Sequence, residues 1–300
     1  MIAKKRIISL LIAVFMVLAM LPMTAQEANA YSKIKITSNG YVYLGGTVSY
    51  DFSKYDSTVK EAELELSNGE KSGDTINDVS INGTKISWQA PSESYYAGFS
   101  ATINVTLSDG REYMSEEIML VKSLDCVDSI PNMTYTGKPI KHTKLVYDYY
   151  DEYEDVVTCA LGRDFTITYK NNLKVGRATA ILTGRGYYRG TKKLYFNIRP
   201  KGTTAKAPKK GKKSFTARWT RQKTKMNKAR ITGYQVQYST DKKFKANVYN
   251  KYVKGYKKTS RKITGLQKKK IYYVRIRTYM SVGGKYYYST WSKVKAVKTK

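Results

Sequence analysis

Polar and apolar residues alternate along short segments of this 300-residue chain. In residues 61–66, glutamates occupy every second position between Ala and Leu, and residues 103–107 alternate aliphatic residues with Asn and Thr. A period of two places successive side chains on opposite faces of a β-strand. Asn-Gly, Asp-Gly and Gly-Gly pairs recur along the chain and favour tight hairpin turns. The pattern therefore predicts an all-β chain.

The first thirty residues follow a different pattern. Residues 4–6 (Lys-Lys-Arg) precede an uncharged, mainly apolar run over residues 7–21, and residues 28–30 (Ala-Asn-Ala) have the small-x-small spacing that a signal peptidase cleaves. This run is too short to cross a bilayer as a helix, which needs roughly 20 residues. We therefore expect residues 1–30 to be a signal peptide, cleaved after Ala30. The mature chain would be secreted and held at a cell surface non-covalently.

Residues 31–122 carry three motifs near their end. They are Trp-Gln-Ala-Pro at 88–91, Tyr-Tyr at 95–96, and an alternating strand that closes with Ser-Asp-Gly at 103–110. This order resembles the late strands of bacterial Ig-like modules. The resemblance implies that residues 31–122 form an Ig-like β-sandwich.

Residues 123–200 carry a longer set of motifs. Tyr-Thr-Gly-Lys-Pro-Ile at 135–140 is followed by Tyr-Lys-Asn-Asn at 169–172 and by Gly-Arg-Gly-Tyr-Tyr-Arg-Gly at 184–190. This series resembles a small Ig-like repeat found in bacterial, largely Gram-positive, surface and secreted proteins. The resemblance implies a second small sandwich. Residues 201–213, rich in Lys, Gly, Thr and Pro, are interpreted as a basic linker.

Residues 214–300 contain Trp219, Gly-Tyr-Gln-Val-Gln-Tyr at 233–238, and Ser-Thr-Trp-Ser at 289–292. Tyr272 follows Leu266 by six residues, the spacing of a tyrosine corner. Together these features resemble a fibronectin type III domain, with Trp219 in the position of its second strand. The whole chain would then contain three tandem Ig-like or fibronectin type III-like β-sandwiches after a cleaved signal peptide. The core residues that this implies for the last domain are Trp219, Tyr234, Leu266, Tyr272 and Trp291.

Charge is concentrated in the last hundred residues. Residues 201–300 hold 31 Lys or Arg and a single acidic residue, Asp241, whereas residues 31–200 hold 20 basic and 21 acidic residues. Lys outnumbers Arg 25 to 6 in the basic region. Because lysine is a compact point charge without a bidentate fork, we expect diffuse binding of a polyanion. The candidate partners are teichoic acid, acidic polysaccharide and extracellular DNA.

Alternation also predicts where this binding surface lies. Since Tyr272, Val274 and Ile276 would point into the core, their neighbours would point outward, and Gln235 and Gln237 would add to the same face. The final strand would contribute two lysines beside them. The predicted polyanion-binding residues are Tyr273, Arg275, Arg277, Lys293 and Lys295. The alternative is that these are ordinary solvated side chains.

The residues that could carry other chemistry are few. His142 is the only histidine, and Cys126 or Cys159 would be its only thiol partner, so we expect no catalytic site, cofactor or resident metal. The two cysteines of an exported chain favour a disulfide, with two buried free thiols as the alternative. The acidic loop at 148–155 could bind calcium, but it lacks Gly at a turn position and the fixed ligand spacing of a calcium site, so a solvated charged loop explains it better.

These observations predict a secreted, non-catalytic, modular protein with an adhesive or structural role. An alternative is that the modules are accessory carbohydrate- or wall-binding domains related to a secreted hydrolase. A further alternative is head-to-tail self-assembly, because residues 31–122 hold 8 basic and 13 acidic residues and could contact a basic last domain. The sequence leaves the ligand open.

Overall fold

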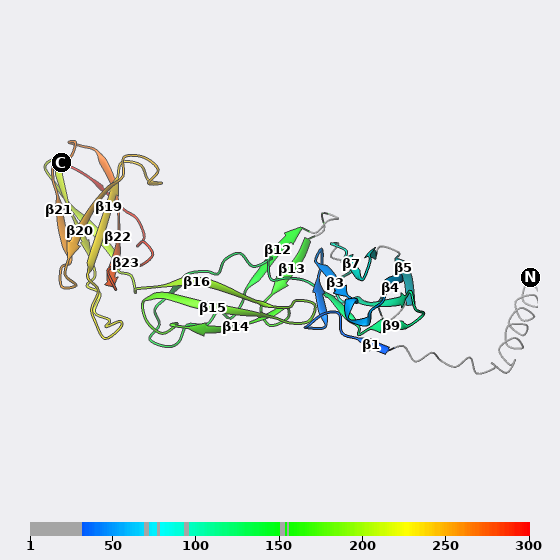
Figure 1. Cartoon of the computed structure of the whole chain (residues 1–300). Helices are drawn as coiled ribbons and strands as arrows, with labels where there is room; N and C mark the ends of the chain where they lie inside the picture. The colour runs from blue at the N-terminus through cyan, green and yellow to red at the C-terminus, as the bar shows by residue number, and fades with distance from the viewer. Residues whose placement is uncertain (1–31, 69–71, 77–78, 93–95, 151–153, 155) are drawn as a thin grey trace, which may run out of the picture. The chain divides into compact units, whose positions relative to one another are not determined.

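The computed structural model describes residues 32–68, 72–76, 79–92, 96–150, 154 and 156–300 (Figure 1). The predicted signal peptide lies outside these residues, and so do Asp151, Glu152 and Asp155 of the acidic loop. Among the residues described, no helix is both long enough and apolar enough to cross a membrane. The described elements are β-strands apart from one short 3-10 turn, η1 (Ser53–Tyr55), which confirms the prediction of an all-β chain.

The chain divides into two compact units. The first contains the described residues of 32–42, of Thr47–Gln89 and of Phe99–Met119, and the second contains those of Leu120–Lys300 with two short earlier segments. The alternation in residues 61–66 explains one strand of the first unit, because Leu64 and Leu66 are buried while the glutamates between them are exposed. Most of the described strand pairs are antiparallel, and each unit also contains a parallel pair.

The described strands up to Val121 lie in two sheets, and two of these strands, β2 and β10, extend past the bounds of the first unit. The larger sheet has the order β1-β9-β8-β10-β2, with β4 pairing β8 and β5, and the smaller has the order β3-β7-β6. Their bounds are β1 (Ser32–Ile34), β2 (Tyr41–Tyr43), β3 (Thr47–Asp51), β4 (Val59–Ser67), β5 (Ser72–Ile76), β6 (Ser80–Asn82), β7 (Lys85–Gln89), β8 (Ser100–Leu107), β9 (Glu112–Ser115) and β10 (Ile118–Val121).

In the second unit, the residues before Pro200 form two sheets. One has the order β11-β16-β15-β14, and the other is the hairpin β12-β13. Phe165, Ala178 and Phe196 pack between them in a buried cluster. The bounds are β11 (Met133–Thr134), β12 (Val146–Tyr150), β13 (Val156–Ala160), β14 (Phe165–Lys170), β15 (Gly176–Gly184) and β16 (Thr191–Arg199).

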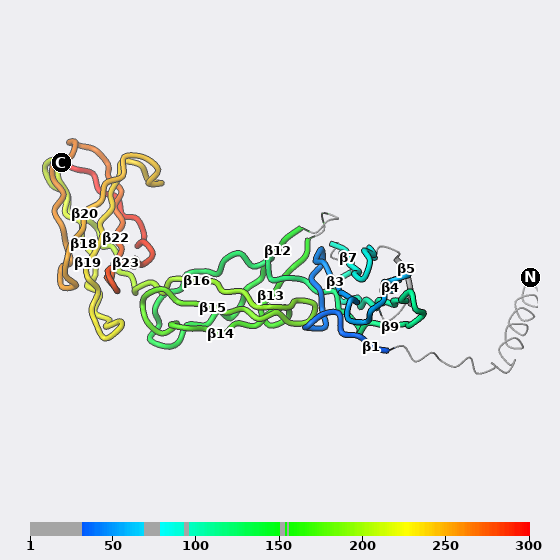
Figure 2. The backbone as a smooth tube through the Cα atoms, viewed as in Figure 1, coloured from blue at the N-terminus to red at the C-terminus, as the bar shows by residue number. Residues whose placement is uncertain are grey.

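The C-terminal module follows as a sandwich of two sheets, drawn from yellow-green to red in Figure 2. The first sheet has the order β17-β18-β21, and the second has the order β20-β19-β22-β23 with β24 also paired to β22. The bounds are β17 (Ala205–Gly211), β18 (Ser214–Trp219), β19 (Gly233–Ser239), β20 (Tyr249–Lys254), β21 (Ser260–Ile263), β22 (Ile271–Val282), β23 (Lys285–Tyr288) and β24 (Lys295–Lys298).

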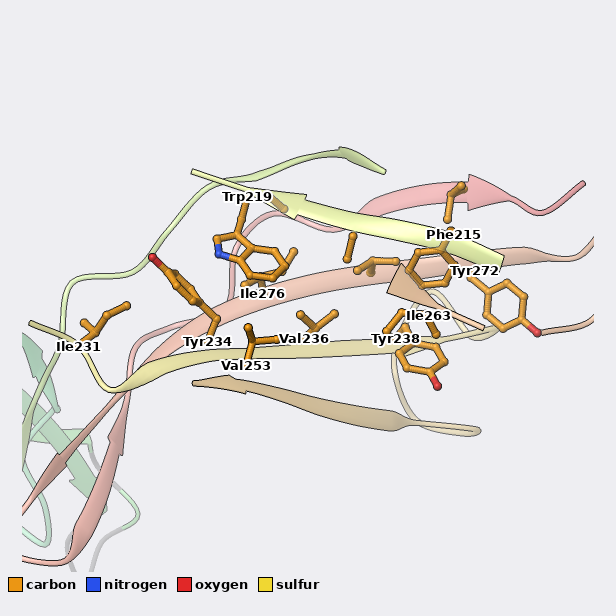
Figure 3. Close-up of a cluster of buried hydrophobic side chains, with 14 of the residues drawn as sticks. Phe215, Trp219, Ile231, Tyr234, Val236, Tyr238, Val253, Ile263, Tyr272 and Ile276 are labelled. Atoms are coloured by element: carbon orange, nitrogen blue, oxygen red, sulfur yellow. The ribbon is translucent and has the colours of Figure 1, made fainter. Parts of the chain in front are cut away.

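Aromatic and aliphatic side chains from both sheets fill the space between them (Figure 3). The rings of Trp219 and Tyr234 meet with centroids 5.1 Å apart. Their polar atoms are satisfied, because Trp219 Nε1 donates to the carbonyl of Lys258 at 2.9 Å and the Tyr234 hydroxyl donates to the carbonyl of Tyr256 at 2.8 Å. Apolar area buried in this way stabilises the sandwich by roughly 25 cal/mol per Å².

Four of the five residues expected in this core are buried, namely Trp219, Tyr234, Leu266 and Tyr272. The hydroxyl of Tyr272 accepts from the backbone N–H of Gln267 at 3.2 Å, as a tyrosine corner requires. Trp291 differs: it is only partly buried and packs against arginines instead of the core.

The expected basic linker also needs correction. Residues 205–211 form β17, which pairs antiparallel with β18 from Ala205 opposite Trp219 to Gly211 opposite Ser214. The Lys-, Pro- and Gly-rich composition predicts a loop, but β17 is an edge strand, where proline is tolerated. The basic residues of this segment are therefore held on a sheet.

Candidate functional site

The one acidic side chain of residues 201–300 is committed to a turn. One carboxylate oxygen of Asp241 accepts from the N–H of Lys243 at 2.8 Å, and the other accepts from those of Lys245 at 2.6 Å and Ala246 at 3.2 Å. These backbone hydrogen bonds hold the pKa of Asp241 below its usual range. Where the chain is described, no ion pair involves a cation of this module. The positive charge of the module is therefore not neutralised from within.

Arg275 and Arg277, two of the predicted binding residues, lie in a stack of alternating cations and rings. The guanidinium carbon of Arg275 lies 4.1 Å from the ring centroid of Phe244 and 4.6 Å from that of Trp291. That of Arg277 lies 4.3 Å from Trp291 and 4.0 Å from Tyr288. We call this set of five side chains the arginine–aromatic ladder. Each contact is an attraction between a cation and the negative face of a ring.

Two buried glutamines anchor the arginines of the ladder. Arg275 Nε donates to Gln237 Oε1 at 2.7 Å, and Arg277 Nε donates to Gln235 Oε1 at 2.6 Å. The amide nitrogens of both glutamines donate in turn to Asn250 Oδ1, at 3.0 and 2.9 Å. These pairs follow the sheet register, in which Gln237 is opposite Arg275 and Gln235 is opposite Arg277. The network fixes both guanidinium groups on the outer face.

Burial within the ladder lowers the pKa of Arg275 and of Arg277. The cause is the removal of water from the charged form. Both remain cations, because arginine side chains are not deprotonated in proteins. Their charge is paired with rings and amide oxygens, which makes the ladder a structural element as well as a basic surface.

The other predicted binding residues do not all join the ladder. Tyr273 is on the same face of β22 as Arg275 and is partly buried. Lys295 is opposite Val274, and Val274 is buried in the core. Lys295 therefore lies on the core-facing side of the sheet, at the start of β24, where its own side chain is exposed. Lys293 is exposed and precedes β24. The expectation that the two lysines share a face with the arginines is therefore wrong for Lys295, because the strand register alternates against it.

A second basic surface lies on the outer face of the other sheet. Lys206 on β17 is directly opposite Arg218 on β18, and Arg218 is directly opposite Ser260 on β21. In the next row, Lys209 is opposite Thr216. Alternating positions on these strands, such as Ala205, Phe215 and Trp219, are buried. We call this surface the lysine face.

A β-bulge puts two lysines of β17 on the lysine face. Lys206 and Lys209 are three residues apart, and in a regular strand they would point to opposite sides. Their partners Arg218 and Thr216 are only two residues apart, so one extra residue of β17 lies between the paired positions. A bulge of this kind re-aims the following side chain. Pro208 lies within it, where the missing N–H costs no ladder hydrogen bond.

The lysine face is hollowed. A cavity of about 430 Å³ opens there and is lined by basic residues, by Ser and Thr residues and by Trp219. The cations are Lys206, Lys209, Arg218, Arg221 and Lys223. The hydroxyls are those of Thr216, Thr220, Thr259 and Ser260. Reasoning from the sequence missed this site because residues 201–213 were interpreted as a linker; the run of lysines beside a strand was the available signal.

The cysteines and the histidine lie in the module before Pro200. Cys126 and Cys159 are free thiols in mutual side-chain contact, not the expected disulfide. That contact lowers the pKa of Cys126 and raises that of Cys159. His142 is buried, its Nδ1 3.1 Å from the hydroxyl of Tyr169 and its Nε2 2.9 Å from the carbonyl of Pro131. Both ring nitrogens of His142 therefore make hydrogen bonds within the fold.

The calcium alternative involves the acidic loop at 148–155, of which Asp148 and Glu154 are described and exposed. Its other acidic residues, Asp151, Glu152 and Asp155, lie outside the described residues. Within the part of the chain that the structure covers, no three or more His, Cys, Asp or Glu side chains are grouped to hold a metal ion.

Comparison with known proteins identifies the C-terminal module. Residues 199–295 match the family model of the fibronectin type III domain, a range that includes β17. No curated protein matches the chain. Matches among solved structures include the chicken CNTN1 FN1-FN3 domains, with 12% identity, a TM-score of 0.30, and coverage of 86% of this chain and 96% of that chain. They also include domains A168-A170 from titin, with 11% identity, a TM-score of 0.26, and coverage of 86% and 95%. This chain is therefore a modular β-sandwich protein that contains a fibronectin type III domain.

Proposed function

We propose that this chain is a secreted, non-catalytic, modular cell-surface protein whose basic fibronectin type III domain binds anionic cell-wall or extracellular polymers. One observation carries the proposal. Residues 201–300 hold 31 basic side chains, and Asp241, the only acidic one, is bound to backbone amides. Like charges gathered without counter-charge repel one another and destabilise the compact state. An anionic partner relieves that repulsion.

The partners are teichoic acid, acidic polysaccharide or extracellular DNA. Lysine dominates the charge, so the attraction is directed at a chain of anions and not at a base or a single sugar. Fibronectin type III and Ig-like domains are generally non-catalytic, in keeping with an adhesive or structural role. The preceding modules act as Ig-like spacers of a bacterial surface protein in this proposal.

Binding to immobilised polymers at two salt concentrations tests the proposal. The purified chain is applied to teichoic acid, heparin, DNA and peptidoglycan stripped of teichoic acid, at about 50 and about 200 mM salt. If about six lysines neutralise phosphates, affinity falls on the order of a thousandfold between these concentrations. Retention on every support with no effect of salt, or on stripped peptidoglycan alone, would contradict an electrostatic role.

Secretion and non-covalent retention have a separate test. Cells that produce the chain are fractionated, and the cell surface is washed with about 1 M salt, at which the screening length falls to about 3 Å. We expect the chain in the wash and a mature N-terminus at Tyr31. A chain that remains in the cytoplasm, or one that resists the salt wash, would rule out this mode of retention.

A further inference from the structure

The lysine face suggests a more specific ligand than a polyanion in general. We propose that the hollow on the outer face of β17, β18 and β21 binds the phosphate groups of a phosphodiester-linked polymer. The inference rests on the proposed function and names its binding face and its anion. The hollow is separate from the arginine–aromatic ladder, which lies on the outer face of the other sheet.

The first step is the position of the cations. Lys206 and Arg218 are directly opposite each other on neighbouring strands. Like charges in that position destabilise a sheet. The carboxylate of Asp241, the only one among the side chains of residues 201–300, is bound to backbone amides and does not relieve the repulsion. An anion that enters the hollow would contact both cations, and its attraction to each of them would outweigh their mutual repulsion.

The second step is the geometry of the donors. Lys206 and Lys209 come from β17, Arg218 comes from β18, and Ser260, whose side chain carries a hydroxyl, comes from β21. A carboxylate presents its acceptor lone pairs in one plane, whereas a phosphate presents oxygens in several directions. Phosphate oxygens accept from Lys, Arg, Ser and Thr alike. Donors that surround one hollow from three strands therefore suit a tetrahedral anion better than a planar one.

The third step is the contrast with the ladder. Arg275 and Arg277 already donate to glutamine oxygens and lie against rings. The lysines of the hollow are exposed and make no such contacts with the rest of the module. A polymer gains more from cations that have no other partner. The hollow extends over two cross-strand rows, that of Lys206 and that of Lys209, so neighbouring phosphates of one chain find separate cations.

Two matched triple variants of the full chain test the inference. The hollow variant is Lys206→Gln, Lys209→Gln and Lys223→Gln, three exposed lysines that line the cavity. The control variant is Lys251→Gln, Lys254→Gln and Lys285→Gln, three exposed lysines on β20 and β23 of the other sheet. Both remove three positive charges. The probes are poly(glycerol phosphate), as the phosphodiester chain, and hyaluronan, as a carboxylate polymer.

We expect the hollow variant to lose at least tenfold in affinity for poly(glycerol phosphate) at about 100 mM salt. Its slope of log affinity against log salt should fall by roughly 2, because each lost phosphate contact contributes about 0.7 to 0.9. The control variant should change less than threefold, and hyaluronan should bind more weakly than poly(glycerol phosphate) at equal charge. A thermal melt of each variant confirms that the module is folded.

The outcomes separate the two levels of the proposal. Equal losses in the two variants would overturn the hollow as the site and leave diffuse polyanion binding in place. Tighter binding of hyaluronan would overturn the choice of phosphate. Failure of the unmodified chain to bind either polymer at low salt would overturn the proposed function itself.

Discussion

On the sheet of β19 and β22, Arg275 and Arg277 lie between aromatic rings and donate to glutamine side chains. On the sheet of β17, β18 and β21, Lys206 is opposite Arg218, and the only acidic side chain of the module is bound to backbone amides elsewhere. The first arrangement satisfies its cations within the fold. The second leaves them to be satisfied by a partner. Basic residues on one small domain can thus have opposite effects on stability, and their contacts decide which.

The largest change in stability that we expect comes from a substitution in the arginine–aromatic ladder. Replacing Trp291 with Ala removes the ring that both arginines contact, and should lower the free energy of unfolding of the module by about 2–3 kcal/mol, because partly desolvated cation–π contacts contribute about 1–2 kcal/mol each. Urea unfolding monitored by hydrogen exchange of the β22 amides measures it. Trp291→Phe, which keeps an aromatic face, should lose about half as much. An unchanged midpoint in Trp291→Ala would show that the ladder does not stabilise the fold.

The glutamines of the ladder come next. Gln237→Met keeps the length of the side chain but removes the acceptor of Arg275 Nε, so we expect the free energy of unfolding to fall by about 1.5–2 kcal/mol, the lower part of the range for a hydrogen bond to a charged group. Gln237→Glu keeps an acceptor and adds a negative charge beside Arg275. The same unfolding measurement should then find Gln237→Glu more stable than Gln237→Met. The reverse order would mean that the hydrogen bond is unimportant.

The sequence predicts which face of the sheet carries the arginines of the ladder, but it does not predict the rings that those arginines contact. A period of two over residues 233–238 and 272–277 predicts that Gln235, Gln237, Arg275 and Arg277 share the outer face, and the register pairs them there. The position of Trp291 depends on two arginines from another strand, which no local pattern encodes. Its assignment to the core therefore failed.

The lysine face was harder to predict for a different reason. β17 has neither alternation nor β-branched residues, and it is a strand because its backbone pairs with β18. The bulge that aligns Lys206 with Lys209 depends on this pairing and on Pro208, so it is a tertiary feature. The side on which Lys295 lies is likewise set by the register of β24 against β22. Local sequence gives the face of a residue only where the strand's start and register are known.

Asp241 is the only acidic residue of the module, so its titration should make the stability of the module depend on pH. Its pKa is lowered in the folded state by hydrogen bonds from backbone N–H groups, that of Lys243 first. A lowered folded pKa gives stability that is present above the unfolded value, about 3.9, and is lost as pH falls through the folded value. In Asp241→Asn this dependence should disappear. Melting temperatures of both proteins from pH 6 down to pH 2 should converge in acid, and parallel curves would exclude the carboxylate as the cause.

The smallest effect, and the one of opposite sign, is expected on the lysine face. Lys206→Gln removes one member of a like-charged cross-strand pair, so the module should become more stable by a few tenths of a kcal/mol at low salt. Added salt should reduce the gain, because screening at about 1 M leaves little repulsion to remove. Thermal melts of Lys206→Gln and of Lys251→Gln, on the other sheet, at low and high salt measure the difference. A loss of stability in Lys206→Gln would mean that this lysine is satisfied within the fold as the ladder arginines are, and the distinction between the two sheets would not hold.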